Sequence, residues 1–455
     1  MTNFNYIESR LGFSEIRSRL LTDCYTPVGR ELAIQAFFSY DADFIVRNLR
    51  LTSEMKYINE FLGGVPALAF DDFRAELQHL KTPGTAVDIP VLQAIAFIIE
   101  KLSDLRALFS QNEGQTPLLC DWINQIMFDS SLAKRIGEVI DEDGEIRSSA
   151  SERLAEIRKE ITGQRKKIER TIQSMLKSLK EKGQVDEDVN LSIRGGRLVI
   201  PVHASKKRMI KGVVLDESAT GQTVFIEPIE IFELNNEVQD LEFEEKREII
   251  KILTALADRI RPQISELFEH IDFIGKIDFI NAKSKLAILY NAVMPVISED
   301  RRMTIMQGRH PVLEESLKKS GRKIIPLDLE LGPEQRMIII SGPNAGGKSV
   351  AMKTTGLLQY MFQCGFLVPA AEGTVLFTFD EILADIGDQQ SIENDLSTYS
   401  SHLLNMKQFM QKGNERTLIL IDEFGSGTEP ESGGAIAEAV LEVLNQSMCY
   451  GVVTT

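Results

Sequence analysis

The chain has 455 residues, 43% of them apolar and 26% charged, a balance typical of folded globular proteins that allows roughly two to four domains. Its net charge of −16 argues against a protein that coats nucleic acid over its whole surface. No apolar run approaches the ~18 residues of a membrane span, and the start of the chain lacks the charged-then-apolar pattern of a secretion signal.

The four cysteines lie far apart and fit neither a disulfide framework nor a zinc site, and the five histidines show no metal-ligand spacing. We therefore expect a cytoplasmic protein with no membrane contact, whose thiols are buried or neutral. A structural role with satisfied hydrogen bonds is the expectation for each histidine.

Residues 1–145 are expected to form a mostly helical domain. Apolar residues recur at helical spacing near its start, and residues 91–108 form a strongly amphipathic pattern. Clusters of glycine and proline, among them Gly63-Gly64-Val65-Pro66, separate the helical segments.

Residues 146–262 are expected to form an antiparallel coiled-coil arm. Ile161, Ile168 and Met175 lie seven residues apart, which predicts a long helix with a narrow apolar seam that ends near Lys182. A second long helix is predicted to start at Pro228, with apolar residues spaced three and four apart.

Between these helices, residues 190–227 alternate apolar and polar residues and contain glycine-rich turns, which predicts a β tip of three or four strands. Beyond the arm we expect a helical return over residues 263–302 and an α/β domain over residues 303–455. Continuous helices join these parts, which suits mechanical coupling between the tip and the last domain.

Positive charge is concentrated in the arm. Residues 151–211 hold 16 Lys or Arg against eight Asp or Glu, a net +8 that leaves the rest of the chain at −24. This pattern fits a confined contact with a polyanion. It fits equally well a solvated helix face with i, i+3 and i, i+4 pairs. The candidate contact residues are Arg165, Lys166, Lys167, Arg194, Arg197, Lys206, Lys207, Arg208 and Lys211.

A phosphate-binding loop is predicted in the last domain. Gly342-Pro343-Asn344-Ala345-Gly346-Gly347-Lys348-Ser349 fits G-x-x-x-x-G-K-[ST], between an apolar run at 337–340 and a helix-compatible stretch at 350–360. Backbone N–H groups of such a loop, and of the helix start near Val350, surround phosphates. Lys348 is expected to reach the β- and γ-phosphates of ATP, and the Ser349 hydroxyl to bind Mg²⁺.

An acidic pair completes the predicted site. Residues 417–421 read as a parallel strand that is buried on both faces, and Asp422 and Glu423 follow where ligands bind in open α/β sheets. Asp422 is expected to hold Mg²⁺ through water, and Glu423 to polarise the attacking water.

These residues resemble the MutS family. The Gly-Pro-Asn opening of the loop, the segment Gly308-Arg309-His310-Pro311-Val312-Leu313 and the segment Asp422-Glu423-Phe424-Gly425-Ser426-Gly427-Thr428 are similar to family motifs. Ser397-Thr398-Tyr399 resembles the family's Ser-Thr-Phe signature, which implies that Ser397 serves the nucleotide of the opposite subunit of a homodimer. The resemblance also implies a nucleotide contact for His310.

The segments 379–393, 196–202 and 218–228 resemble the second bacterial subfamily, which lacks the mismatch-reading and connector domains. The implied fold is a multidomain, mostly α lever and core with a coiled-coil clamp arm and β tip, then an ABC-like α/β P-loop ATPase domain. The chain ends where family members continue, so the resemblance implies a fragment with weak or no ATPase activity and no nuclease activity of its own.

The implied function is that of a clamp ATPase that binds branched or structured DNA in repair or in suppression of recombination. The alternative is a ribosome-associated ATPase that acts on stalled ribosomes through rRNA. Both use the same phosphate chemistry, and the sequence does not separate them.

Overall fold

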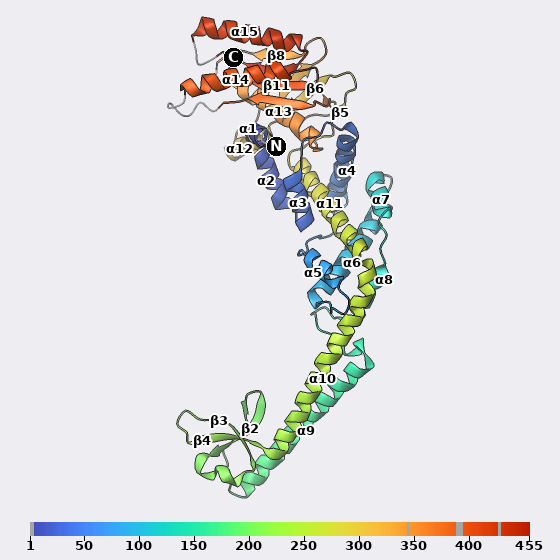
Figure 1. Cartoon of the computed structure of the whole chain (residues 1–455), viewed down its shortest axis with the longest axis vertical. Coiled ribbons are helices and arrows are strands. Elements are labelled where there is room, and N and C mark those ends of the chain that lie inside the picture. The colour runs from blue at the N-terminus through green and yellow to red at the C-terminus, as the bar shows by residue number, and fades with distance from the viewer. Residues whose placement is uncertain (1–3, 344–345, 388–394, 426–428) are drawn as a thin grey trace. The chain divides into compact units, whose positions relative to one another are not determined.

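The computed structural model describes residues 4–343, 346–387, 395–425 and 429–455 (Figure 1). The chain divides into two compact units. Unit 1 comprises Met1–Asp72, Glu100–Phe128 and Glu269–Thr455, and unit 2 comprises Phe73–Ile99 and Asp129–Phe268. In the described ranges, no helix combines the length and apolar character that a membrane span requires.

Residues 4–139 are mostly helical, as predicted. Their helices are α1 (Phe4–Leu11), α2 (Phe13–Asp23), α3 (Pro27–Gln35), α4 (Ala42–Phe61), α5 (Arg74–Leu80), α6 (Ile89–Gln111), α7 (Pro117–Asn124) and α8 (Ser130–Val139). Local sequence explains several helix starts. Asp41 accepts hydrogen bonds from the backbone N–H of Asp43 and Phe44 at the start of α4, and Thr26 caps α3 ahead of Pro27.

A four-stranded parallel sheet forms the centre of the last part of unit 1. Its order is β10 (Glu381–Asp385), β11 (Thr417–Ile421), β12 (Tyr450–Thr454) and β8 (Met337–Ile340). The two strands predicted on either side of the site, 337–340 and 417–421, are thus confirmed. All five residues of β11 are buried, because the strand lies between two neighbours and is covered on both faces.

Alternate residues of the sheet face different helices. Leu383, Ile419, Ile421 and Val453 share an apolar cluster with Met406 and Phe409 of α14 (Asp395–Lys412) and with Val440 and Leu444 of α15 (Pro430–Gln446). Leu418, Leu420 and Val452 instead join the larger core that contains α13 (Lys348–Gln363). Helices therefore cover both faces of the sheet (Figure 1).

A second small sheet lies in the same unit, with the order β5 (Val296–Ile297), β9 (Val375–Leu376), β6 (Met303–Gly308) and β7 (Leu327–Leu331). α11 (Ile264–Leu289) precedes it in the chain, and α12 (Pro311–Lys319) follows β6. The predicted helical return over residues 263–302 corresponds mainly to α11.

Helix α13 is buried along most of its length and packs closely against its neighbours. A Cβ atom added at Gly356 would lie 2.4 Å from Leu420 of β11 and 2.8 Å from Leu11 of α1, so a larger residue would force these elements apart. The ring of Phe13 on α2 packs edge-on against Tyr360, with centroids 4.9 Å apart. The first two helices of the chain are therefore part of the core around α13.

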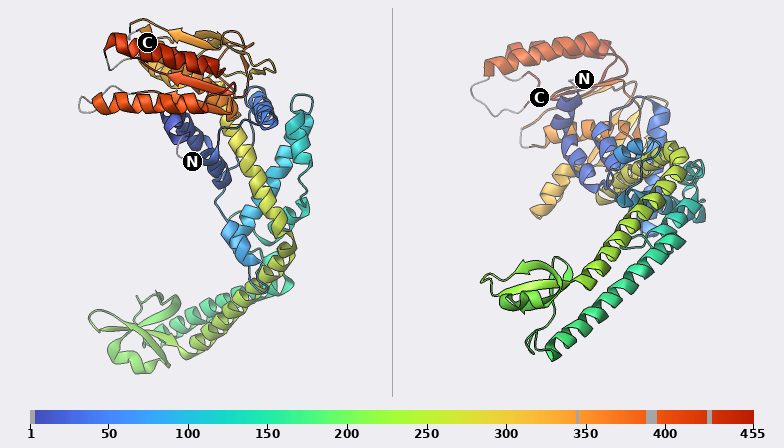
Figure 2. Two further views of the ribbon diagram at one scale, coloured as in Figure 1. Left: turned by 45° about the horizontal axis from the view of Figure 1, so that its top comes forward. Right: turned by 60° about the horizontal axis from the view of Figure 1, so that its bottom comes forward.

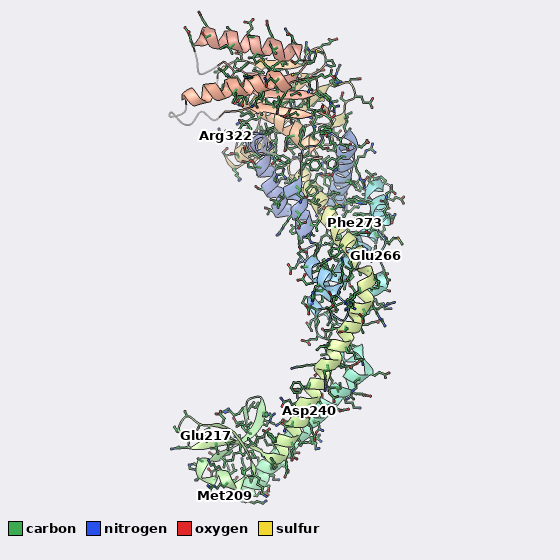
Figure 3. All side chains as sticks on the ribbon, in the orientation of Figure 1. Met209, Glu217, Asp240, Glu266, Phe273 and Arg322 are labelled. Carbon is green, nitrogen blue, oxygen red and sulfur yellow. The ribbon has the colours of Figure 1, made fainter. Side chains whose placement is uncertain are left out.

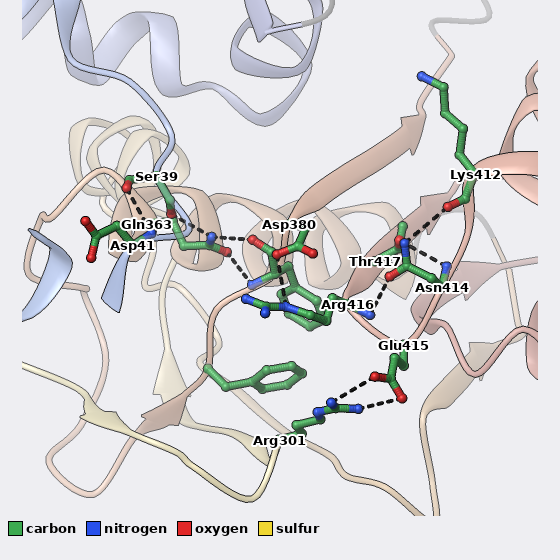
Figure 4. A network of polar contacts seen from close by, with 12 residues as sticks. Ser39, Asp41, Arg301, Gln363, Asp380, Lys412, Asn414, Glu415, Arg416 and Thr417 are labelled. Carbon is green, nitrogen blue, oxygen red and sulfur yellow. Dashed lines mark hydrogen bonds and ion pairs between the residues drawn. The ribbon is translucent and has the colours of Figure 1, made fainter. Parts of the chain in front are cut away.

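Gln363 at the end of α13 ties three segments together (Figure 4). Its side-chain amide donates to the carbonyl of Ser39 at 2.8 Å and to that of Phe379 at 2.7 Å, and accepts from the N–H of Phe379 at 3.1 Å. The side chain is fully buried, so each of these groups depends on it for a partner. Nearby, the ion pairs Arg416–Asp380 and Arg301–Glu415 lie at the surface.

Unit 2 contains a pair of long helices, α9 (Glu152–Glu181) and α10 (Ile229–Ile260), which run side by side (Figure 2). Arg153 pairs with Glu244 and Arg165 with Glu242, while Gln164 bonds Glu237 and Ser151 bonds Glu248, which fits an antiparallel arrangement. The predicted seam is buried at Ile161, Ile168 and Ile172. Exposed ion pairs add little stability, so the apolar seam holds the helices together.

Four antiparallel strands join the two helices. β1 (Ser192–Arg194), β2 (Arg197–His203), β3 (Gly212–Glu217) and β4 (Thr223–Pro228) form a sheet in the order β1-β2-β4-β3, within the predicted range of three or four strands. Short 3₁₀ turns complete the unit at Ser148–Ala150, Ala204–Met209 and Arg261–Gln263. Ile200, Val202, Val224 and Ile226 share one core with the helix seam.

The division into two units differs from the four predicted segments. Residues 1–145 are divided between the units, because α1 and α2 pack on α13 while α5 and α8 belong with the arm. The predicted arm over residues 146–262 lies entirely in unit 2, and residues 303–455 lie entirely in unit 1.

Gln363→Leu is expected to lower the free energy of unfolding by about 3 kcal/mol, because it leaves buried backbone groups of Ser39 and Phe379 without partners. Gln173→Leu, at an exposed position of α9, is the matched control and should change it by less than about 0.5 kcal/mol. Denaturant titration measures both values. Equal effects of the two substitutions would contradict the structural role of Gln363.

Candidate nucleotide site

The glycine-rich loop leads from β8 into α13. Gly342 has φ 147° and Gly347 has φ 82°, both in the region that favours glycine, and α13 begins directly afterwards at Lys348. The N–H of Gly346 donates to the carbonyl of Pro343 at 3.0 Å. Asn344 and Ala345, also predicted to bind the nucleotide, lie outside the described residues. The predicted strand precedes these two residues and the predicted helix follows them.

Lys348 is buried, and its ammonium group donates to two carbonyl oxygens, those of Gly342 and, at 2.6 Å, Thr455. These acceptors hold the ammonium at the mouth of the loop. Hydrogen bonds to charged phosphate oxygens are stronger than those to neutral carbonyls, so a phosphate entering the loop could replace them. The role of Lys348 toward the phosphates of ATP stays a prediction.

Asp422 connects three elements at the carboxyl edge of the parallel sheet. Its Oδ1 accepts from the Ser349 hydroxyl at 2.8 Å and from the Thr454 hydroxyl at 2.5 Å, while its own N–H donates to the carbonyl of Asp385 at 2.9 Å. The side chain of Asp422 is almost fully buried. The structure thus brings together the two residues that the sequence assigned to Mg²⁺.

A hydroxyl and a carboxylate in contact are oxygen donors of the kind that Mg²⁺ binds while it keeps several waters. Ser349 and Asp422 would hold the ion, which would neutralise charge on the phosphates. Among the described residues, no group of three or more His, Cys, Asp or Glu side chains is placed to hold a metal on its own.

Glu423 occupies an unusual backbone position. Its φ is 49°, which is uncommon for a residue with a side chain and costs of order 1 kcal/mol or more. The turn is fixed by hydrogen bonds, from the N–H of Glu423 to the Thr454 hydroxyl at 2.9 Å and from the N–H of Phe424 to the Thr454 carbonyl at 2.8 Å. The side chain of Glu423 is half-buried and lines a small hollow together with Asp422 and His402.

Three other predicted site residues have mixed outcomes. Val350 lies exposed in the first turn of α13. His310 caps α12 and lies against Gly12 between α1 and α2, and burial lowers its pKa to about 4, so the ring is neutral. Ser397 belongs to α14, but its side chain lies outside the described part of the chain. Their roles toward a nucleotide stay predictions.

A polar group that the sequence did not indicate lies beside the acidic pair. Asp385, at the end of β10, accepts from Nδ1 of His402 at 2.5 Å and from Asn405 at 2.9 Å, and it is almost fully buried. His402 also lines a small hollow with Asp422 and Glu423. The hydrogen bond that His402 donates to Asp385 raises the pKa of His402. Partial burial lowers this pKa, and the negative charges of Asp385 and Glu423 raise it further.

The candidate nucleic-acid residues of unit 2 fall into two groups. Four are paired inside the unit: Arg165 with Glu242, Arg194 with Asp216, Arg197 with Glu227 and Lys206 with Asp186. Lys166, Lys167, Lys207, Arg208 and Lys211 are exposed, and no ion pair is found for them within the described residues. The partners of the four paired residues lie far along the sequence and not at i, i+3 or i, i+4. A contact of the five exposed residues with a polyanion stays a prediction.

Arg197 illustrates the paired group. Its guanidinium lies 3.1 Å from a carboxylate oxygen of Glu227, which is fully buried and also accepts from Asn235 at 2.5 Å. Arg197 and Glu227 lie on the neighbouring strands β2 and β4, so loss of Arg197 would leave a buried charge of the sheet with Asn235 of α10 as its remaining partner among the described residues. Arg197 and Arg165 also line a hollow of about 600 Å³ between β2, α9 and α10.

All four cysteines are buried and free, as predicted, and burial raises the pKa of Cys24 to about 12 and that of Cys449 to about 11. Thiols in this state are unreactive near neutral pH.

The fold and the site define a multidomain protein of helices and small sheets, with a glycine-rich Lys-Ser loop at the carboxyl edge of a parallel sheet. Residues 338–455 match the family model for MutS domain V. Three curated relatives, each called Endonuclease MutS2, match almost the whole chain. The protein of Enterococcus faecalis is 34% identical over 452 residues, that of Geobacillus sp. 33% over 448, and that of Thermomicrobium roseum 35% over 459.

These alignments cover 98–99% of this chain but only 56–57% of the relatives' own length. The chain belongs to the MutS family and is of the MutS2 type.

The raised pKa of His402 predicts a pH-dependent contribution to stability. The contribution is present at pH values below the unfolded pKa of about 6.5 and is lost as the pH rises through the higher folded value. His402→Gln should therefore lower the free energy of unfolding more at about pH 5.5 than at about pH 9. Denaturant titrations of the wild type and the variant at each pH measure the difference in their free energies of unfolding. A difference that does not change with pH would show that Asp385 does not stabilise the protonated form of His402.

Proposed function

We propose that the loop at residues 342–349 binds ATP with Mg²⁺, and that the intact protein hydrolyses it. The observation that carries this proposal is the 2.8 Å contact between Ser349 and Asp422 beside the buried ammonium of Lys348. The three residues come from different elements, α13 and the end of β11, at the edge where parallel sheets bind ligands. A hydroxyl, a carboxylate and a cation together match the oxygen and phosphate groups of Mg-ATP.

Each side chain has a definite task in this proposal. Backbone N–H groups of the loop and the first turn of α13 bind the phosphates, with Gly346, Gly347 and Val350 among them. Lys348 moves from its carbonyl acceptors to the β- and γ-phosphates, and Glu423 orients and polarises the attacking water. Bound Mg²⁺ would bridge phosphate oxygens and reduce their negative charge.

We further propose that two copies act as a homodimer, with Ser397 of each helping to bind the nucleotide of the other and His310 lying near the nucleotide. In this arrangement ATP favours the closed dimer, and hydrolysis opens it. The paired helices α9 and α10 with their sheet serve as a clamp arm for nucleic acid.

The proposed ligand of the clamp is branched or structured DNA, in repair or suppression of recombination. The exposed cations Lys166, Lys167, Lys207, Arg208 and Lys211 support a contact with phosphates, which is salt-dependent and weakly sequence-specific. The relatives' name refers to an enzyme that acts on nucleic acid, which agrees with a nucleic-acid ligand. Ribosomal RNA offers the same phosphate groups, so ribosomes are the alternative ligand to compare with a DNA junction.

Lys348→Ala should abolish tight binding of Mg-ATP, because it removes the cation that faces the β- and γ-phosphates. Isothermal titration calorimetry measures the affinity. The matched control is Glu423→Gln, which keeps the phosphate contacts and should bind ATP like the wild type. In the full-length protein Glu423→Gln should also stop turnover. Unchanged ATP affinity of the Lys348 variant would refute the assignment of the loop as the phosphate-binding site. Wild-type turnover of the Glu423 variant would show that Glu423 does not activate the attacking water.

Lys207→Ala together with Arg208→Ala should weaken binding to a four-way DNA junction and lower the salt slope of log K by about 2, since two phosphate contacts are lost. Arg322→Ala together with Lys323→Ala removes the same charges from an exposed segment of unit 1 (Arg322 is labelled in Figure 3) and should leave both quantities unchanged. Equal effects of the two double variants would indicate nonspecific attraction. Retention on ribosomes but not on the junction, at matched salt, would favour the ribosomal alternative.

A further inference from the structure

Strand β3 is an exposed edge of the sheet in unit 2. It pairs with β4 on one side, and none of the strands in the described ranges lies on its other side. All six residues, Gly212–Glu217, are exposed, including the consecutive apolar residues Val213 (37%), Val214 (41%) and Leu215 (38%). A shift in the β3–β4 register between Val214 and Asp216 leaves Leu215 without a partner on β4.

Such an edge is unusual in a protein that stands alone. Edge strands of soluble proteins present unpaired N–H and C=O groups, and their sequences commonly place charge or proline in the strand to prevent pairing. The centre of β3 contains neither, and three neighbouring apolar side chains there gain free energy when covered. Met209, which lies three residues before the strand and is labelled in Figure 3, is also 56% exposed.

The charges at the two ends of β3 indicate what covers it. Lys211 stands before the strand with its side chain exposed, and Glu217 closes it at the other end (Figure 3). Asp216 is already paired with Arg194 at 2.9 Å. A strand laid antiparallel to an identical strand places the lysine of each beside the glutamate of the other, with the apolar residues between them. Nucleic acid is a poor match for this edge, because its centre is apolar and its end acidic.

We propose that β3 pairs antiparallel with β3 of a second copy of this chain, about a two-fold axis close to Val214. The pairing covers the β3 edge of both copies in one closed, two-fold contact. It adds a second meeting point, between the arm tips, to the homodimer of the proposed function and rests on that function to this extent. Two arms joined in this way would enclose a nucleic acid.

Cross-linking of the full chain tests the pairing directly. All four native cysteines are buried, so Val214→Cys supplies the exposed thiol. A short bismaleimide reagent should link two copies of the Val214→Cys variant, because opposing side chains near the axis lie within its reach. Ile193→Cys is the matched control, since Ile193 is exposed on β1 at the opposite edge of the sheet, and it should form at least tenfold less dimer.

Charge exchange provides an independent readout. In the Val214→Cys background, Lys211→Glu alone or Glu217→Lys alone should slow cross-linking roughly fivefold, because like charges then face each other across the axis. The double variant, with both substitutions, should restore the rate. Circular dichroism of each variant confirms that the sheet is folded.

Three results would overturn the pairing: a Val214→Cys protein that stays monomeric, equal cross-linking at Val214 and Ile193, or a double charge variant that is slower than either single one. The reactions are run with and without ATP. Failure of cross-linking in a protein that still binds ATP overturns the tip pairing alone, whereas cross-linking in a protein without ATP affinity leaves the pairing in place and removes the nucleotide function.

Discussion

The carboxylate of Asp422 is the contact on which the site depends. Its Oδ1 accepts hydrogen bonds from two hydroxyl groups, that of Ser349 on α13 and that of Thr454 on β12. Thr454 in turn fixes the backbone of Glu423. Because Asp422 is almost fully buried, its charge requires these donors, and the donors fix the positions of α13, β11 and β12 relative to one another. Thr454 thus links the two acidic residues, because the hydroxyl that donates to Asp422 also accepts from the N–H of Glu423.

Helix α13 carries this constraint into the rest of unit 1. Its first turn contributes Ser349, its middle presses Gly356 against both Leu420 and Leu11, and its last residue bonds Ser39 and Phe379. A helix buried and tied at both ends cannot shift at one end alone. A ligand that displaced Lys348 and Ser349 from their present partners would therefore act on a helix connected to Leu11 of α1 and to Phe379, just before β10.

Local signals were enough to predict the loop, the two strands beside it and the acidic pair, because each is encoded in a few consecutive residues. The seam of α9 and the strands of the tip were also predictable, since periods of seven and two are visible in the sequence. The contact between Asp385 and His402 was not, because it joins the end of a strand to a helix 17 residues later without a motif. The division into units was missed for a related reason: Glu8 and Tyr360, which bond in the core, are 352 residues apart.

The left-handed backbone at Glu423 has a consequence for the balance between folding and chemistry. Glutamate adopts this conformation reluctantly, whereas glycine adopts it freely, so a glycine at this point would relieve local strain and make the protein more robust. That exchange would also discard the carboxylate beside Asp422. The role proposed for Glu423 would account for an acidic side chain at a position where a glycine gives the more stable fold.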